Sequence, residues 1–132
     1  MPEKDLAANW TDVLLTEGAE PIVTYRSGLT VYEESLTSGR FVGRGWNASG
    51  YVNYYDGRLD PKQHPMPQAF WLEMDGQLLT WDWEWQGLEE MPEPEAPEGT
   101  RHVVLSLRHT VRPVSVKVHT KLDGTAILTR WL

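Results

Sequence analysis

The chain has 132 residues, which suits one domain, and it is long enough to bury a core without covalent cross-links. It has no cysteine, which excludes disulfides, thiolate zinc sites and cysteine nucleophiles. Residues 1–99 hold 6 basic and 18 acidic residues (net −12), whereas residues 100–132 hold 6 basic and one acidic residue (net +5). A chain this acidic over most of its length repels phosphates, so we expect no nucleic-acid partner. It has no apolar run of membrane-spanning length and no signal-like start, so we expect no membrane partner and a cytoplasmic location.

In the first half of the chain, short β-prone runs are separated by glycine or by Ser-Gly. Runs of this kind predict strands and give no helical periodicity. We expect five strands here, at residues 13–16, 21–26, 29–33, 40–46 and 50–55.

In the second half, two Asp-Gly pairs stand between β-prone runs, which is the strongest short-range signal for a hairpin. Asp75-Gly76 separates 69–74 from 77–85, and Asp123-Gly124 separates 114–122 from 125–132. A further alternating strand is expected at 102–110. We therefore predict an all-β fold, an antiparallel β-sandwich of the supersandwich type, that forms a single domain over residues 1–132.

Two proline-rich stretches are expected to be loops, at 56–67 and 89–99, because proline cannot donate to a sheet ladder. The last run stays apolar and strand-like up to Trp131 and Leu132. We expect from this that the domain is an N-terminal piece of a longer protein, truncated at its C-terminus. An exposed final strand could also pair with a second copy and form a homodimer.

Trp81, Trp83 and Trp85 alternate with Asp82 and Glu84, so a strand would project the three indoles from one face. Flat aromatic faces suit a carbohydrate platform, but three indoles in a row also suit the core between two sheets. The same alternatives apply to Tyr51, Tyr54 and Tyr55. The two carboxylates on the opposite face are interpreted as solvated side chains.

The loop from Asp56 to Pro65 concentrates acids, bases, a histidine and turn formers between two strands. Loops between strands are where binding residues tend to lie, although a plain surface crossover fits as well. The four histidines are scattered without metal-type spacing, and the sequence has no nucleotide or nucleophile motif, so we expect no metal and no cofactor.

Two segments together resemble the N-terminal β-sandwich of family 36-like α-galactosidases. The first is 69–79, which precedes the tryptophan-rich strand. The second is the block formed by 105–110, 116–125 and 128–132, which follows the pattern V-x-V-H-x-x-L-D-G-x-x-x-L-x-x-W-L. The resemblance covers about half of the chain and contains no catalytic signature.

This resemblance implies a parent glycoside hydrolase whose catalytic aspartates lie in a downstream barrel, so no catalytic residue is expected in this chain. It implies that the sandwich supports the barrel and partly rims its sugar pocket. Two alternatives stay open: a free-standing carbohydrate-binding module with a tryptophan platform, and a purely structural interaction domain. The candidate substrate-binding residues are Trp46, Tyr54, Tyr55, Asp56, Arg58, Asp60, His64, Trp81, Trp83 and Trp85.

Overall fold

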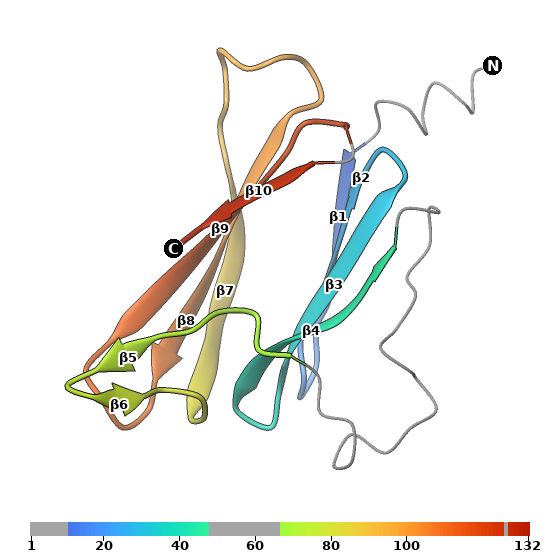
Figure 1. Ribbon diagram of the computed structural model, residues 1–132. Helices are drawn as coiled ribbons and strands as arrows, with labels where there is room; N and C mark the ends of the chain where they lie inside the picture. Colours follow the sequence, from blue (N-terminus) through green and yellow to red (C-terminus); the bar gives the residue numbers. More distant parts are fainter. Residues whose placement is uncertain (1–10, 48–66, 126) are drawn as a thin grey trace.

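The protein was analysed as a computed structural model that describes residues 11–47, 67–125 and 127–132. Over these residues it is all-β, which confirms the predicted fold class (Figure 1). In the described part of the chain the strands are β1 (Thr11–Thr16), β2 (Ile22–Ser27), β3 (Thr30–Thr37), β4 (Arg40–Asn47), β5 (Glu73–Met74), β6 (Gln77–Leu78), β7 (Trp83–Met91), β8 (Arg101–His109), β9 (Ser115–Leu122) and β10 (Leu128–Trp131).

The strands form two four-stranded antiparallel sheets and one short hairpin. The first sheet has the order β1-β2-β3-β4, and the second has the order β10-β9-β8-β7. The sheets lie beside each other as a sandwich, and hairpin β5–β6 lies at their lower end in the view of Figure 1. Antiparallel meanders of this kind need only short connections between neighbouring strands.

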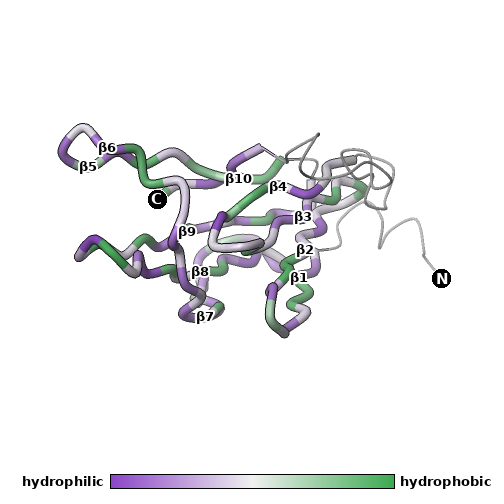
Figure 2. Tube along the Cα trace, turned by 90° about the horizontal axis from the view of Figure 1, so that it is seen from below, coloured by the Kyte–Doolittle hydropathy of each residue, from purple (hydrophilic) through white to green (hydrophobic). Residues whose placement is uncertain are grey.

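The core lies between the sheets and is supplied mainly by β8 and β9. Val103, Leu105 and Leu107 face inward along β8, with Ser106 and Arg108 on the other face, and Val116 and Val118 face inward along β9. Because successive side chains of a strand point to opposite faces, one face of this sheet packs inward and the other meets solvent. Apolar and hydrophilic positions can be followed along both sheets in Figure 2.

Backbone contacts near β4 link the first sheet to the second sheet and to the hairpin. The Gly39 carbonyl between β3 and β4 accepts a hydrogen bond from the Trp83 amide at the start of β7, at 3.0 Å. Segment 67–72 runs along β4, where the Gly43 amide donates to Pro67 and Val42 bridges Gln68. This segment leads directly into hairpin β5–β6.

Several predicted boundaries are corrected. Residues 77–85 are not one strand: β6 ends at Leu78, and β7 begins at Trp83 and pairs with β8 rather than with the hairpin. Asp82 between them has φ 70°, a left-handed conformation that interrupts an extended chain. Strand β7 also continues to Met91, so the loop predicted at 89–99 begins three residues later.

The two Asp-Gly signals had different outcomes. Asp75-Gly76 forms the predicted two-residue turn, with positive φ at both residues, as a type I′ turn requires. Asp123-Gly124 opens a longer connection, because β9 ends at Leu122 and β10 begins at Leu128. The Asp123 carboxylate accepts hydrogen bonds from the amide and hydroxyl of Thr125, which stabilises a turn inside that connection.

The predicted strand at 50–55 lies outside the described residues, as does the loop at 56–67 except for Pro67. The described ranges contain no helix that is long and apolar enough to cross a membrane.

Candidate functional site

A buried ion pair joins the two sheets. Glu34 of β3 is completely buried, next to a register shift between Glu33 and Glu34. Arg130 of β10 reaches it from the other sheet, with Nη1 to Oε1 at 2.5 Å and Nη2 to Oε2 at 2.6 Å. The guanidinium also donates to the Thr120 hydroxyl, from Nη2 at 2.8 Å and from Nε at 3.1 Å. A bidentate pair with further hydrogen bonds is the arrangement that offsets the cost of burying two charges.

Two tyrosines enclose this ion pair. The Tyr25 hydroxyl donates to Glu34 Oε2 at 2.9 Å, and the Arg130 guanidinium lies over the rings of Tyr25 and Tyr32, at 5.4 and 5.3 Å from their centroids. Burial, and then the Glu34 charge, raise the pKa of both phenols well above the ordinary value. Burial alone would lower the pKa of Arg130, but the Glu34 carboxylate more than offsets this and raises it. The two tyrosines therefore stay neutral and the Arg130 guanidinium stays charged.

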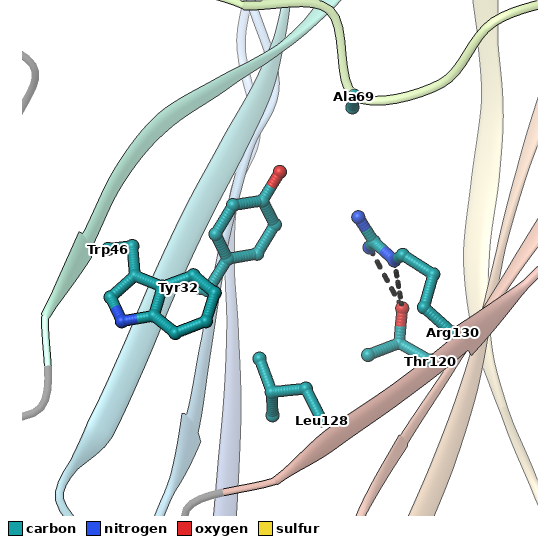
Figure 3. A pocket seen from close by; sticks show the side chains of 6 residues that line it. All are labelled: Tyr32, Trp46, Ala69, Thr120, Leu128 and Arg130. Carbon is teal, nitrogen blue, oxygen red and sulfur yellow. Dashed lines mark hydrogen bonds between the residues drawn. The ribbon is translucent and has the colours of Figure 1, made fainter.

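Next to this network is an open pocket of about 230 Å³ between the sheets (Figure 3). Trp46 of β4 stands opposite Tyr32 of β3 across their strand pair, and its side chain is 60% exposed. Arg130 enters the pocket from the second sheet. The described residues that line the pocket are Tyr32, Trp46, Ala69, Thr120, Leu128 and Arg130.

The chemistry of this pocket suits contact with a neutral molecule. Two aromatic rings offer flat apolar faces, and the charges of Arg130 and Glu34 cancel. The polar groups in the pocket already bond to one another, so they offer few unused donors to a ligand. The pocket can therefore supply a stacking surface, whereas a polar ligand needs most of its hydrogen bonds from elsewhere.

Of the three tryptophans predicted as one row, Trp83 and Trp85 share the inward face of β7, whereas Trp81 lies apart from them. Trp83 is only 4% exposed, with its indole N–H donating to the Leu79 carbonyl and the edges of Phe70 and His109 packed near its ring. Trp85 is half-buried against the core. Trp81 precedes β7, is 54% exposed and lies 5.0 Å from the Arg40 guanidinium.

A shared tryptophan platform on one strand face is therefore absent, because the left-handed Asp82 breaks the alternation before Trp83. The alternative interpretation, in which the tryptophans pack in the core between the sheets, holds for Trp83 and in part for Trp85. Trp46 is the predicted site residue that the structure places at a pocket. The remaining candidates lie outside the described residues: Tyr54, Tyr55, Asp56, Arg58, Asp60 and His64.

The other chemical groups considered from the sequence have ordinary surroundings. Glu84 is exposed and lies 3.8 Å from Arg108 in an ion pair, and Asp82 is exposed in the turn before β7. Among the residues that the structure describes, no group of three or more His, Asp or Glu side chains is arranged to hold a metal ion.

Sequence reasoning missed Glu34, Arg130, Thr120 and Tyr32. Glu34 and Arg130 are 96 residues apart, and no local pattern pairs them. One signal was available. Arg130 lies two residues after Leu128 and so shares the inward face of its strand, and a charged residue in that position requires a buried partner of opposite charge.

The comparisons with known proteins found no similar protein: no family model, no curated protein and no solved structure matches this chain.

Proposed function

We propose that this chain is a non-catalytic β-sandwich of a carbohydrate-active enzyme similar to α-galactosidases, acting in the cytoplasm. In this proposal the sandwich packs against a downstream catalytic barrel and partly rims its sugar pocket. The partners are a carbohydrate and that barrel. The observation that carries the proposal is the aromatic pocket between the sheets, with exposed Trp46 at its side.

The roles of the motif residues support a structural part in a larger enzyme. In the segment that resembles the α-galactosidase sandwich, Val116, Val118 and Leu122 are core residues, and Arg130 bonds Glu34 of the other sheet. These residues hold the sandwich together.

The composition of the pocket supports a rim rather than a complete binding site. Sugars are bound by stacking on aromatic faces together with hydrogen bonds to their hydroxyl groups. The pocket supplies Trp46 and Tyr32 for stacking, but the Arg130 guanidinium already donates to Glu34 and to Thr120. The missing hydrogen bonds would come from the barrel.

The free-standing module is less well supported, because its platform required Trp81, Trp83 and Trp85 to present faces together, and Trp83 is buried. Titration of the 132-residue chain with methyl α-galactoside, followed by tryptophan fluorescence, separates the two. The proposal expects no saturation up to millimolar sugar, whereas a free-standing module gives a saturable change.

The decisive experiment extends the reading frame beyond Leu132. We expect the following sequence to encode alternating strands and helices, and the longer protein to hydrolyse p-nitrophenyl α-galactoside. A reading frame that stops at Leu132, or a longer protein without glycosidase activity, refutes the proposal.

In that longer protein, the Trp46→Ala substitution tests the rim. Loss of a stacking face should raise KM by about tenfold with little change in kcat, because the lost contact is made with bound substrate. Trp71→Ala is the matched control, since Trp71 is 66% exposed and is not among the residues lining the pocket. An equal rise in KM for both substitutions would show that Trp46 is not part of the rim.

A further inference from the structure

A second cluster lies on the outer face of the β7–β10 sheet, the face opposite the pocket. His102 of β8 and His119 of β9 approach within hydrogen-bonding distance, with Nε2 and Nδ1 at 2.9 Å. Trp131 of β10 stands opposite His119 in the strand register. Its indole stacks on the His119 ring, with centroids 4.9 Å apart and planes 13° apart, and it also contacts the His102 ring at 5.1 Å.

The connection between β7 and β8 covers one side of this cluster. Glu93 lies with Oε2 at 3.6 Å from His102 Nδ1, and its other oxygen accepts a hydrogen bond from Lys121 at 2.6 Å. The Lys121 ammonium holds the pKa of Glu93 below its usual value, so this carboxylate stays charged in mild acid. A negatively charged carboxylate therefore lies beside the Nδ1 side of the His102 ring.

The bond between the two histidines limits how many protons the pair can hold. One of the two facing nitrogens must carry a lone pair to accept the hydrogen bond. When both rings are protonated, both facing nitrogens are donors, and two positive charges are brought together at 2.9 Å. The bond is then lost, and because Glu93 holds the far side of the His102 ring, His119 is the ring that turns away.

We propose that His102 and His119 form a pH-sensitive latch, which holds Trp131 of β10 against the sheet near neutral pH and releases it when both imidazoles are protonated. The other charged groups facing the pair set the strength of the latch. On the outer face they are Glu89 of β7, Lys117 and Lys121 of β9, and Glu93 and Glu95 of the connection. In β10 the outward residues are Thr129 and Trp131, neither of which is titratable.

The release is confined to the outer side of β10. On the inner side of the same strand Arg130 makes a bidentate pair with Glu34 and bonds Thr120, and its guanidinium keeps its charge in mild acid. Acid therefore frees the Trp131 indole while the strand stays anchored. An aromatic face that is covered at neutral pH becomes available to a ligand or to a neighbouring strand.

Hydrogen exchange of individual backbone amides tests this latch. Between about pH 7.5 and about pH 5, where imidazoles change charge, we expect the protection of the β10 amides, corrected for intrinsic rates, to fall about tenfold. The amides of β8 should change less than about twofold over the same range, because that strand is paired on both sides. Unchanged β10 protection in the natural chain overturns the proposal.

Two substitutions separate the latch from general acid destabilisation. His119→Asn keeps an amide nitrogen near the position of Nδ1 and cannot be protonated, so β10 protection should become independent of pH. His102→Gln does the same for Nε2 and serves if the first variant does not fold. The control is His64→Asn, which removes one imidazole elsewhere in the chain. A fall in β10 protection equal to that of the natural chain in either latch variant refutes the proposal.

Discussion

The two four-stranded sheets bury very different side chains. Strands β8 and β9 of the sheet β7–β10 bury mainly apolar side chains, such as Leu105, Leu107 and Val118, with Arg108 and Lys117 on the exposed face. The sheet β1–β4 buries polar groups as well as apolar ones, including Glu33 and Glu34. The comparison teaches that alternation identifies the inner face only where the partners are apolar. A buried carboxylate requires a specific partner, which can come from any distance along the chain.

The two buried glutamates illustrate this requirement. Glu34 is satisfied by Arg130 from the opposite sheet, and Glu33 by Thr24 at 2.8 Å and Arg44 at 3.0 Å within its own sheet. Such pairs contribute little net stability when intact, but removal of one partner leaves an uncompensated buried charge. The predictions below test this contrast.

The largest effect is expected for Glu34→Ala, which leaves the Arg130 guanidinium without its counter-charge. We expect a loss of about 3–5 kcal/mol in the free energy of unfolding, measured by urea denaturation. The control is Glu84→Ala, whose side chain forms an exposed pair with Arg108. It should cost about 0–1 kcal/mol. A loss for Glu34→Ala no larger than for Glu84→Ala would show that the buried pair is not a structural requirement.

The next effect concerns alkaline pH. An unfolded tyrosine loses its proton near pH 10, whereas burial raises the pKa of Tyr25 and Tyr32 in the folded state. Above about pH 10 the folded chain therefore binds more protons than the unfolded chain, and stability falls as pH rises. Below about pH 10 both states hold these protons and the effect is absent.

Absorbance at 295 nm measures this titration directly. Two of the five tyrosines should resist ionisation until the protein unfolds. In Tyr32→Phe the alkaline loss of stability should be less steep. Ionisation of all five tyrosines in the folded protein would contradict the expected burial.

A smaller effect tests the contact between the sheets at Gly39. Gly39 has φ 80°, and an added Cβ would meet the Asp82 backbone nitrogen at 3.2 Å, whereas Gly76 has φ 79° and open space around it. Both alanine variants share the backbone strain. Gly39→Ala should therefore lose about 1 kcal/mol more than Gly76→Ala in urea denaturation, because only Gly39 packs against the other sheet. Equal losses would mean that the sheets adjust freely at this point.

The smallest effect is expected for Arg101→Ala. Arg101 makes a bidentate pair with Glu90, at 2.7 and 3.0 Å, between partners that are both partly exposed. Solvent screens such pairs, so the loss should be about 1 kcal/mol or less, and it should shrink further in high salt. If the free energy of unfolding falls nearly as much for Arg101→Ala as for Glu34→Ala, exposed and buried ion pairs do not differ in this protein as proposed.

Local patterns predicted the strands well and the site poorly. Strands β8 and β9 were recognisable because valine and leucine recur at every second position, and the Asp75-Gly76 turn because both residues tolerate positive φ. The prediction of three tryptophans in one row was wrong because Asp82 adopts a left-handed conformation. Nothing in the neighbouring sequence indicates this conformation. Glu34 and Arg130 could not be paired because the contact depends on how the two sheets face each other.

Segment 67–72 also affects how the molecule unfolds. It bonds to β4 at Pro67 and Ala69, and its Leu72 carbonyl accepts from the Leu79 amide just before β7 begins. One continuous stretch of chain is therefore anchored to the first sheet and to the entrance of the second. Because neither half can separate without breaking these anchors, the two halves should melt together in a single calorimetric transition, with the calorimetric and van't Hoff enthalpies in agreement.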